Sequence, residues 1–340
     1  MQDVKDAYNI ISEDLAAFDQ MASKLISKVD PFVDDVVRYG LQLSGKRLRP
    51  ALLFLTARGI GTITENHIRI AAAIELIHTA TLIHDDILDG AFMRRHLTTI
   101  NFKWDSHVAV LAGDILLTKA MELLTNADDI YGFKRITIAC RQTCEGELLQ
   151  IGTIGNFKIS QKEYMKIIAR KTSPFLACCT ELGAHYAGAS PEITEIFNNF
   201  GHQLGIAFQM IDDILDFTEQ TNMTGKTLHT DIINRKPTAP LIRYLQKAPK
   251  KESDEILMML KCNRSCNSKF SNNTTYNISN KKAELIVNRI CRSGVIREIQ
   301  QKAESIVERA IKSIANFPSG NTHAIKGLIA IARYITLRHS

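Results

Sequence analysis

The chain has 340 residues, of which 45% are hydrophobic and 23% are charged, so its composition is that of a globular protein with enough material for a substantial core. The formal net charge is +6, from 42 Lys and Arg against 36 Asp and Glu, and the basic residues form no long run of the kind that binds nucleic acid. Composition therefore excludes a nucleic-acid-binding arm, and no window reaches the roughly 18 to 20 apolar residues of a membrane span.

The N-terminal residues 1–19 carry acidic side chains early and contain no uninterrupted apolar stretch, so they predict neither a secretory signal nor a transit peptide. Seven cysteines are an odd number spread along a long chain, which does not indicate a disulfide framework. Both features favour a reducing compartment, and we expect a cytoplasmic protein.

Apolar residues recur at three- and four-residue spacing through almost every segment, for example at Ile70, Ala73 and Ile77. Alternating β-branched runs bounded by tight turns, which would indicate strands, are nearly absent. The sequence therefore predicts an all-α fold, a single large helical bundle of about ten or more helices. We expect residues 1–340 to form one domain, with a flexible polar surface loop at about 261–280, where Asn and Ser dominate.

Basic residues gather in the segment SGKRLRP, residues 44–50, just before a helix that we expect to begin near Pro50. Lys46, Arg47 and Arg49 place ammonium and guanidinium groups beside the helix N-terminus, where an anion binds favourably. Basic turns are also common on ordinary surfaces, so this segment alone is a weak indication.

The motif DDILD occurs twice, at residues 85–89 and 212–216. Within each copy the first and last aspartates are four residues apart, so on a helix their carboxylates lie on one face, with about 5 to 6 Å between Cβ atoms. Most acidic residues on helices are solvated or pair with a nearby lysine or arginine. Here both copies lie among apolar residues and have no basic partner four residues away.

Carboxylates clustered in apolar surroundings repel one another and are costly to desolvate unless cations compensate for them. Mg²⁺ retains several waters and prefers one or two carboxylates together with the phosphate oxygens of a substrate. If the two helices face each other across the bundle, the motifs predict a cavity in which Mg²⁺ ions hold a diphosphate.

Further cations and hydrogen-bond donors lie near the two motifs. Arg94 and Arg95 follow the first motif, and His78 lies about two helical turns before Asp85. Later segments add the donors Lys171, Thr172, Gln209, Lys226 and Lys236. Tandem arginines can be simple charge balance and a lone helical histidine is usually structural, so these residues gain weight only from one another.

Together, the two DDILD motifs and these cations resemble the trans-polyprenyl diphosphate synthase family, in particular its long-chain octaprenyl, solanesyl and heptaprenyl diphosphate synthases, which make polyprenyl tails for quinones. The resemblance extends from near Asp19 to the C-terminus. It implies the isoprenoid synthase fold, with helices around a central cavity. It also implies a prenyltransferase that condenses isopentenyl diphosphate repeatedly onto an allylic primer, farnesyl or geranylgeranyl diphosphate.

The resemblance assigns a role to each site residue. The residues expected to bind isopentenyl diphosphate are Lys46, Arg49, His78 and Arg95. Those expected to bind the allylic diphosphate are Arg94, Lys171, Thr172, Gln209 and Lys226, and Lys236 is a further substrate-binding candidate. The expected ligands of two or three Mg²⁺ ions are Asp85, Asp89, Asp212 and, through water, Asp216, with Asp86 and Asp213 supporting the cluster. The six aspartates, Lys171 and Lys226 form the expected catalytic group.

In the implied reaction, cations neutralise the leaving diphosphate so that the allylic carbon–oxygen bond ionises. The double bond of isopentenyl diphosphate attacks the carbocation, a proton is lost, and no side-chain nucleophile is required. The resemblance also suggests a homodimer, and a greasy product suggests peripheral membrane contact during its release.

The departures from the family pattern are local, and one of them is Thr98-Thr99 in place of a Pro-Thr pair. His96 follows the tandem arginines where the family usually has glycine. His229 and Arg235, after the second motif, also stand where the family usually has glycines. These changes bear on the loop geometry around Lys226 and Lys236.

Product length depends on the residues four and five positions before Asp85, which would floor the path of the growing chain. These residues are Thr81 and Ala80, both small, whereas short-chain relatives typically place an aromatic residue there. One helical turn rises about 5.4 Å, comparable to one isoprene unit, so we expect an all-trans product of about six to ten units. A deeper floor near Met121 is only a candidate.

Several alternatives remain open at this point. A geranylgeranyl diphosphate synthase would share all the motifs and differ in product length. A terpene cyclase would mix Asn, Ser or Thr with Glu in its second metal site, and a non-catalytic partner subunit of a heteromeric synthase would have lost motif residues. A purely structural helical protein would leave the acidic clusters unexplained.

Overall fold

The computed structural model describes residues 2–26, 30–43, 45, 47–125, 130–218, 229–261, 278–315, 317 and 321–337. Within these residues it contains seventeen helices and one two-stranded hairpin, so the predicted all-α fold class is confirmed. None of the described helices combines the length and apolar character needed to cross a bilayer. Lys46, Lys226 and residues 262–277 of the expected polar loop lie outside the described residues.

The helices are α1 (Gln2–Ile10), α2 (Ser12–Ile26), α3 (Pro31–Gln42), α4 (Leu48–Ile60), α5 (Glu65–Leu88), α6 (Ile100–Lys103), α7 (Ser106–Thr125), α8 (Ile130–Gly152), α9 (Gln161–Lys171), α10 (Ser173–Tyr186), α11 (Pro191–Thr218), α12 (Thr230–Ile233), α13 (Ala239–Lys247), α14 (Lys250–Leu260), α15 (Asn280–Arg292), α16 (Val295–Ile314) and α17 (Thr322–Thr336). The strands β1 (Met93–Arg94) and β2 (Leu97–Thr98) pair antiparallel, with Met93 opposite Thr98.

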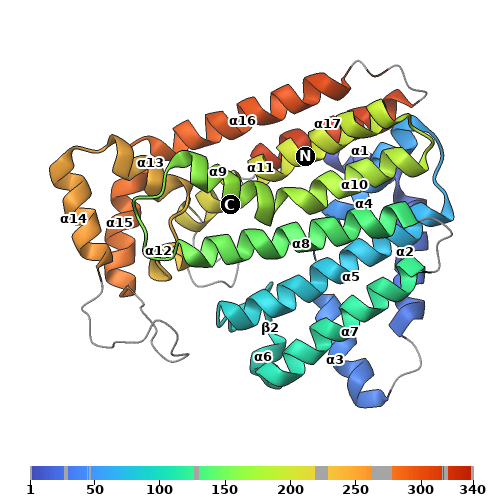
Figure 1. Ribbon diagram of the computed structural model, residues 1–340, viewed down its shortest axis with the longest axis horizontal. Coiled ribbons are helices and arrows are strands. Elements are labelled where there is room, and N and C mark those ends of the chain that lie inside the picture. Colours follow the sequence, from blue (N-terminus) through green and yellow to red (C-terminus); the bar gives the residue numbers. More distant parts are fainter. Residues whose placement is uncertain are drawn as a thin grey trace.

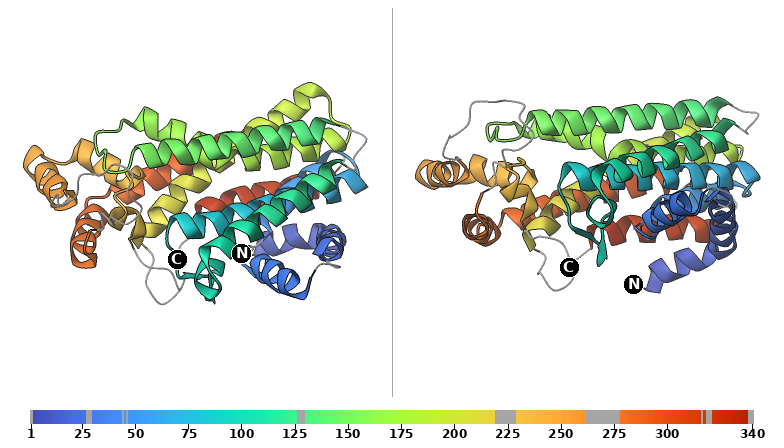
Figure 2. Two further views of the ribbon diagram at one scale, coloured as in Figure 1. Left: turned by 60° about the horizontal axis from the view of Figure 1, so that its bottom comes forward. Right: turned by 90° about the horizontal axis from the view of Figure 1, so that it is seen from below.

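The long helices run side by side along the long axis of the molecule (Figure 1). Helix α5 packs against α4 and α7, α10 packs against α4, α8 and α11, and α11 packs against α16. Helices α1 to α3 cover one side of this bundle, and α8 lies on the opposite side (Figure 2). Helices α12 to α15 gather at the end of the bundle where α5 and α8 finish (Figure 1).

The core consists of apolar side chains that the helical periodicity directs inward, including the fully buried Phe54, Ile74, Phe197 and Phe200. Burying a side chain of this size contributes roughly 1.5 to 3 kcal/mol. Close approach of α10 and α11 depends on Gly205, because a Cβ there would lie 2.4 Å from the Cα of Ser173. The core therefore holds the ends of α5, α10 and α11 in a fixed relation at one end of the bundle.

Candidate active site

The first DDILD motif occupies the C-terminal end of α5, where Asp89 is the C-cap. Gly90 follows with φ of 61°, a left-handed conformation that glycine adopts without a Cβ clash. The chain then turns back, and the Ala91 N–H donates to the Asp86 carbonyl at 2.9 Å. This helix end presents Asp85 and Asp89 one turn apart on one face of α5.

Asp85 and Asp86 are neighbours with different surroundings. Asp86 is buried and accepts from Arg94, whose Nε lies 2.9 Å from both carboxylate oxygens and whose Nη2 lies 2.8 Å from Oδ1. Burial raises the pKa of Asp85 to about 6, Lys171 opposes the rise, and Glu147 adds to it. Asp86 therefore anchors the hairpin that carries Arg94, whereas Asp85 is a desolvated carboxylate that a cation would stabilise.

The second motif lies at the end of α11 and contains a similar contrast. Asp213 is 3% exposed and accepts three hydrogen bonds, from Tyr164 Oη at 2.7 Å, Gln209 Nε2 at 2.9 Å and Ala239 N at 3.1 Å. Burial raises its pKa to about 6 against the effect of these donors. Asp213 therefore joins α11 to α9 and α13, while Asp212 is exposed and available to a ligand.

Asp216 ends the second motif and holds the start of α12. Its carboxylate accepts from Thr230 N at 3.2 Å, Thr230 Oγ1 at 2.8 Å and Asp231 N at 3.1 Å, and its carbonyl lies 3.1 Å from His229 Nδ1. Burial raises the pKa of Asp216. It also raises the pKa of Asp231, and the nearby carboxylates of Asp216 and Asp213 raise that pKa further. Asp231 is thus a seventh carboxylate of the site. Sequence reasoning missed it because a single acidic residue after the motif carries no spacing signal.

Lys236 connects the two motifs. Its Nζ lies 2.9 Å from Asp89 Oδ1, and its side chain is only 14% exposed. Burial lowers its pKa, but Asp89 and Asp231 outweigh that effect, so the pKa is raised and the ammonium stays charged. Because Asp231 lies beside Asp216, this lysine places the second motif across from the first.

Three residues that stand where glycine was expected, His96, His229 and Arg235, have a left-handed backbone, and the last two flank the short helix α12 before Lys236. His96, His229 and Arg235 have φ of 64°, 59° and 57°, so each adopts the left-handed conformation that favours glycine. Such a conformation costs a residue with a Cβ roughly 1 to 2 kcal/mol. The Arg235 carbonyl also accepts from the Gly155 N–H at 3.0 Å, which helps to fix this turn. The substituted residues therefore preserve a turn of the kind that glycine would form.

Three of the predicted allylic-site residues are brought together around the junction of α9 and α10. Lys171 Nζ lies 2.7 Å from Glu147 Oε2 and 2.6 Å from Gln150 Oε1, both on α8. Thr172 Oγ1 donates to Gln209 Oε1 at 2.5 Å. Gln209 in turn donates to Asp213, so this cluster is continuous with the second motif. Sequence reasoning missed Glu147 and Gln150, which look like ordinary polar residues of an amphipathic helix.

The predicted isopentenyl diphosphate site contains a second cationic cluster. Burial lowers the pKa of Arg49, nearby Glu75 opposes that effect, and Arg49 Nε has no acceptor among the described residues. Burial also holds the pKa of His78 well below its ordinary value, and Arg49, Arg94 and Arg95 lower it further. The structure therefore groups His78 with these three arginines and keeps the imidazole neutral.

The two residues expected to control product length lie beside the first motif. Ala80 is fully buried in the core, and Thr81 is half-buried with its Oγ1 donating to the His78 carbonyl at 2.7 Å. Their role in a product tunnel stays a prediction.

The donor chemistry of the site suits a hard cation, because Asp85, Asp89 and Asp212 offer carboxylate oxygens. Across the described ranges, no three His, Cys, Asp or Glu side chains converge closely enough to hold one metal ion by themselves. Carboxylate oxygens fit Mg²⁺, which takes few protein ligands and completes its shell with phosphate oxygens and water.

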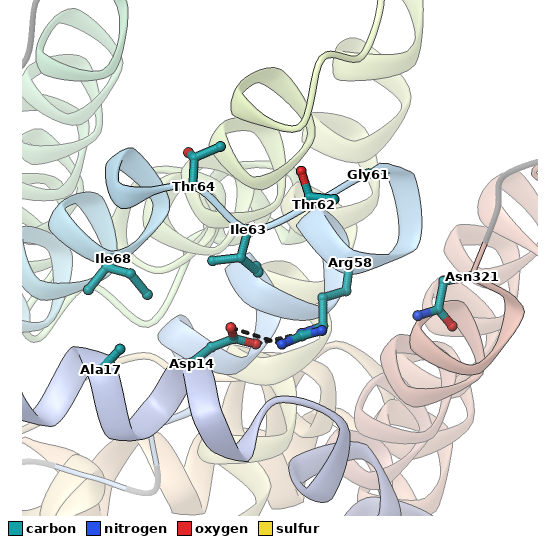
Figure 3. Close-up of a pocket in the computed structure, with 9 residues that line it drawn as sticks. All are labelled: Asp14, Ala17, Arg58, Gly61, Thr62, Ile63, Thr64, Ile68 and Asn321. Carbon is teal, nitrogen blue, oxygen red and sulfur yellow. Dashed lines mark hydrogen bonds and ion pairs between the residues drawn. The ribbon is translucent and has the colours of Figure 1, made fainter.

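A separate cavity of about 440 Å³ lies at the opposite end of α5 (Figure 3). Its walls include the ion pair of Asp14 and Arg58, whose shortest N–O distance is 2.6 Å, and Asn321 from the start of α17. None of the residues that line it belongs to the predicted site.

Known proteins resemble the chain over most of its length. Residues 30–276 match the protein family described as Polyprenyl synthetase. The all-trans-nonaprenyl-diphosphate synthase (geranyl-diphosphate specific) of Rhodobacter capsulatus is 32% identical over 309 residues, covering 91% of this chain and 90% of that protein. The geranylgeranyl diphosphate synthase of Methanosarcina mazei is 36% identical over 218 residues, covering 63% and 67%. The crystal structure of a polyprenyl synthase from Caulobacter crescentus CB15, complexed with calcium and isoprenyl diphosphate, is 26% identical with a TM-score of 0.88, covering 99% and 98%.

Proposed function

The chain belongs to the polyprenyl synthetase family and is a prenyltransferase that condenses isopentenyl diphosphate with an allylic diphosphate, and we propose that its product is an all-trans polyprenyl diphosphate of about six to ten isoprene units. The observation that carries this function is the contact of Lys236 with Asp89, because it brings the end of α11 and the segment after it to the end of α5. Two DDILD motifs then share one site.

We propose that Mg²⁺, as two or three ions, is the cofactor of this site. Asp85, Asp89 and Asp212 would hold it directly and Asp216 through water, since Asp216 already accepts hydrogen bonds from Thr230 and Asp231. The calcium and isoprenyl diphosphate in the Caulobacter crescentus structure support a divalent cation together with a diphosphate. When bound, Mg²⁺ supplies charge neutralisation of the leaving diphosphate.

The side chains around the allylic diphosphate assist its departure. When the carbon–oxygen bond breaks, the electron pair moves to the diphosphate, and positive groups fixed nearby stabilise that charge. Lys171 and Arg94 are such groups, with Lys226 expected beside them, and Gln209 and Thr172 supply further polar atoms. The released diphosphate is the proposed acceptor of the proton that is finally lost.

The second diphosphate site orients isopentenyl diphosphate for attack. Arg49, with a buried Nε that lacks an acceptor among the described residues, is placed to bind an anion. His78 is neutral and would contribute a hydrogen bond, whereas Arg95 would contribute charge. Lys46 is proposed to join them. The double bond then supplies the electrons of the new carbon–carbon bond.

We propose that the residues beside the first motif permit a long product. Ala80 and Thr81 are small side chains beside the first motif, which supports a long product made from farnesyl or geranylgeranyl diphosphate as primer. A geranylgeranyl diphosphate synthase remains the alternative. A catalytically inactive partner subunit is disfavoured, because both motifs and the described cations are intact. The long product would serve as a quinone side-chain precursor and would leave through peripheral membrane contact.

We further propose a homodimer and a cytoplasmic location. Helices α7 and α8 expose large apolar side chains, including Leu111 at 62% and Leu148 at 69%, which a second copy would cover. Light scattering tests this, with a dimer expected and a monomer for Leu111→Glu combined with Leu148→Glu. A wild-type monomer would contradict it.

The proposed cytoplasmic location rests on cysteine usage, since the five described cysteines are free thiols.

Product analysis of the purified chain tests the proposed function. Labelled isopentenyl diphosphate, farnesyl diphosphate and Mg²⁺ are incubated with the protein, and the products are sized after dephosphorylation. We expect extension to about six to ten isoprene units and none when the metal is chelated. Stopping at four units would replace the long-chain proposal by the geranylgeranyl one. No extension at all would favour the partner-subunit alternative.

A further inference from the structure

Lys171, the last residue of α9, lies in a cradle formed by α8. Glu147 Oε2 lies 2.7 Å from its Nζ, and Gln150 Oε1 lies 2.6 Å from the same atom. Gly146 lets the two helices approach, because a Cβ there would lie 2.4 Å from the Lys171 backbone nitrogen. Three features of one helical turn of α8 therefore fix both the backbone and the ammonium group of Lys171.

The cradle leaves part of the ammonium group for a ligand. A lysine ammonium has three N–H donors, and the described contacts with Glu147 and Gln150 use two of them. Lys171 is also the positive group that most strongly opposes the raised pKa of Asp85, so it lies toward the first motif. The remaining N–H is therefore available to an anion that enters between the motifs.

We propose that Glu147 is a positioning residue for the allylic diphosphate. Together with Gln150, it holds the Lys171 ammonium where the leaving diphosphate develops its charge, without itself touching the substrate. This inference rests on the proposed function. A free lysine side chain has many rotamers, and ordering it before the substrate arrives lowers the cost of reaching the reactive geometry.

A neighbouring ion pair on the same two helices provides a comparison. Glu145 Oε2 lies 2.6 Å from Arg170 Nη1, one residue before Lys171, and Glu145 also pairs with Arg141. The side chains of Arg170 and Glu145 are 43% and 34% exposed, against 24% and 23% for Lys171 and Glu147. The first pair is a surface pair of the ordinary kind, whereas the second faces the carboxylates of the site.

The test compares Glu147→Ala, Glu147→Gln and the matched control Glu145→Ala by steady-state kinetics with each substrate varied in turn. We expect Glu147→Ala to lower kcat/KM for the allylic diphosphate by about 10- to 100-fold, the effect of a misplaced group, with KM for isopentenyl diphosphate within about twofold. Glu147→Gln keeps an acceptor oxygen and is expected within about fivefold of wild type. Glu145→Ala should match wild type.

Equal kinetics of Glu147→Ala and Glu145→Ala would overturn the inference, as would an equal loss toward both substrates. If Glu147→Ala does not fold, Glu147→Leu takes its place. A larger loss of kcat/KM in Glu147→Leu than in Glu147→Gln then supports the inference, and equal losses overturn it. If the wild-type chain forms no product, the proposed function fails. Calorimetry with a non-reacting allylic thiodiphosphate and Mg²⁺ then decides the positioning role. Weaker binding by Glu147→Ala than by Glu145→Ala supports it, and equal binding overturns it.

Discussion

Lys236 and Asp89 are 147 residues apart in the sequence, and their side chains meet at an N–O distance of 2.9 Å. The contact joins the turn after α12 to the end of α5. It also neutralises one carboxylate of the first motif before a ligand arrives. Lys236 thus limits the repulsion among Asp85, Asp89 and Asp231 that would otherwise oppose the folded arrangement.

Replacing Lys236 by Ala is expected to lower kcat/KM for the allylic diphosphate by about 10- to 100-fold, because an electrostatic donor and the link between the motifs are lost together. Steady-state kinetics at saturating Mg²⁺ measure this. Lys247→Ala, which breaks a surface pair with Glu298, is the control and should leave the kinetics unchanged. Wild-type kinetics for Lys236→Ala would remove this residue from the site.

Asp212 and Asp213 are adjacent but should respond differently to mutation. Asp213→Ala leaves the Tyr164 hydroxyl and the Ala239 N–H without their buried acceptor, so we expect the free energy of unfolding to fall by about 2 to 4 kcal/mol. Asp212→Ala should lower kcat by about 100-fold or more and change the unfolding free energy by less than about 0.5 kcal/mol. Chemical denaturation and steady-state assays measure the two effects. A large loss of stability in Asp212→Ala, together with unchanged stability in Asp213→Ala, would contradict the described burial.

Ala80→Phe is expected to shorten the product, because an aromatic side chain would block the path beside α5. Sizing the products of wild type and variant after identical incubation measures this. Ala80 is fully buried, so the larger residue also costs about 1 to 3 kcal/mol of stability. Thr81→Phe, at a half-buried position, tests the same path with less strain. Unchanged product length in both variants would contradict this account of chain-length control.

His67 makes the stability of the fold depend on pH. Its Nδ1 accepts from the Thr64 N–H at 2.9 Å and its Nε2 lies 3.2 Å from the Gly183 carbonyl, so the buried ring is neutral. Burial lowers its pKa below the ordinary 6.5. The unfolded chain therefore binds this proton more readily, and stability that is present above pH 6.5 is lost as pH falls below it.

Denaturation of wild type and His67→Gln between pH 8 and pH 5 should show a difference that grows on the acid side, by up to about 1.4 kcal/mol for each pH unit. The non-titrating variant removes only the contribution of His67. His107→Gln, at a side chain that is 97% exposed, is the control and should follow wild type. Parallel curves for wild type and His67→Gln would show that the ring does not titrate differently on folding.

The helical fold was predictable because apolar spacing of three and four residues reports which face of each helix is buried. The two DDILD motifs could be singled out as a candidate site because carboxylates repeated among apolar residues need positive charge to compensate for them. Helix geometry also places Gln209 one turn before Asp213 on α11, and Gln209 donates to that carboxylate. Local rules were sufficient wherever the partner residues belong to one helix.

Contacts between distant segments were not predictable by the same reasoning. Glu147 and Gln150 join the site only because Lys171 at the end of α9 contacts them. Asp231 joins it only because α12 folds back onto Asp216. Arg235 likewise accepts a hydrogen bond from Gly155, a contact between distant segments that local spacing does not indicate. Such residues are of common types and lie at common spacings, so the sequence does not distinguish them from the residues of a solvated helix face.

The central claim is that both DDILD motifs hold one diphosphate together, and a double-mutant cycle tests it most directly. Calorimetry measures the Mg²⁺-dependent binding of a non-reacting allylic thiodiphosphate to wild type, Asp85→Asn, Asp212→Asn and the double variant. A shared site predicts that each single substitution weakens binding strongly and that the second adds much less, a coupling of about 1 to 3 kcal/mol. Two additive losses, with separate binding retained at each motif, would contradict it.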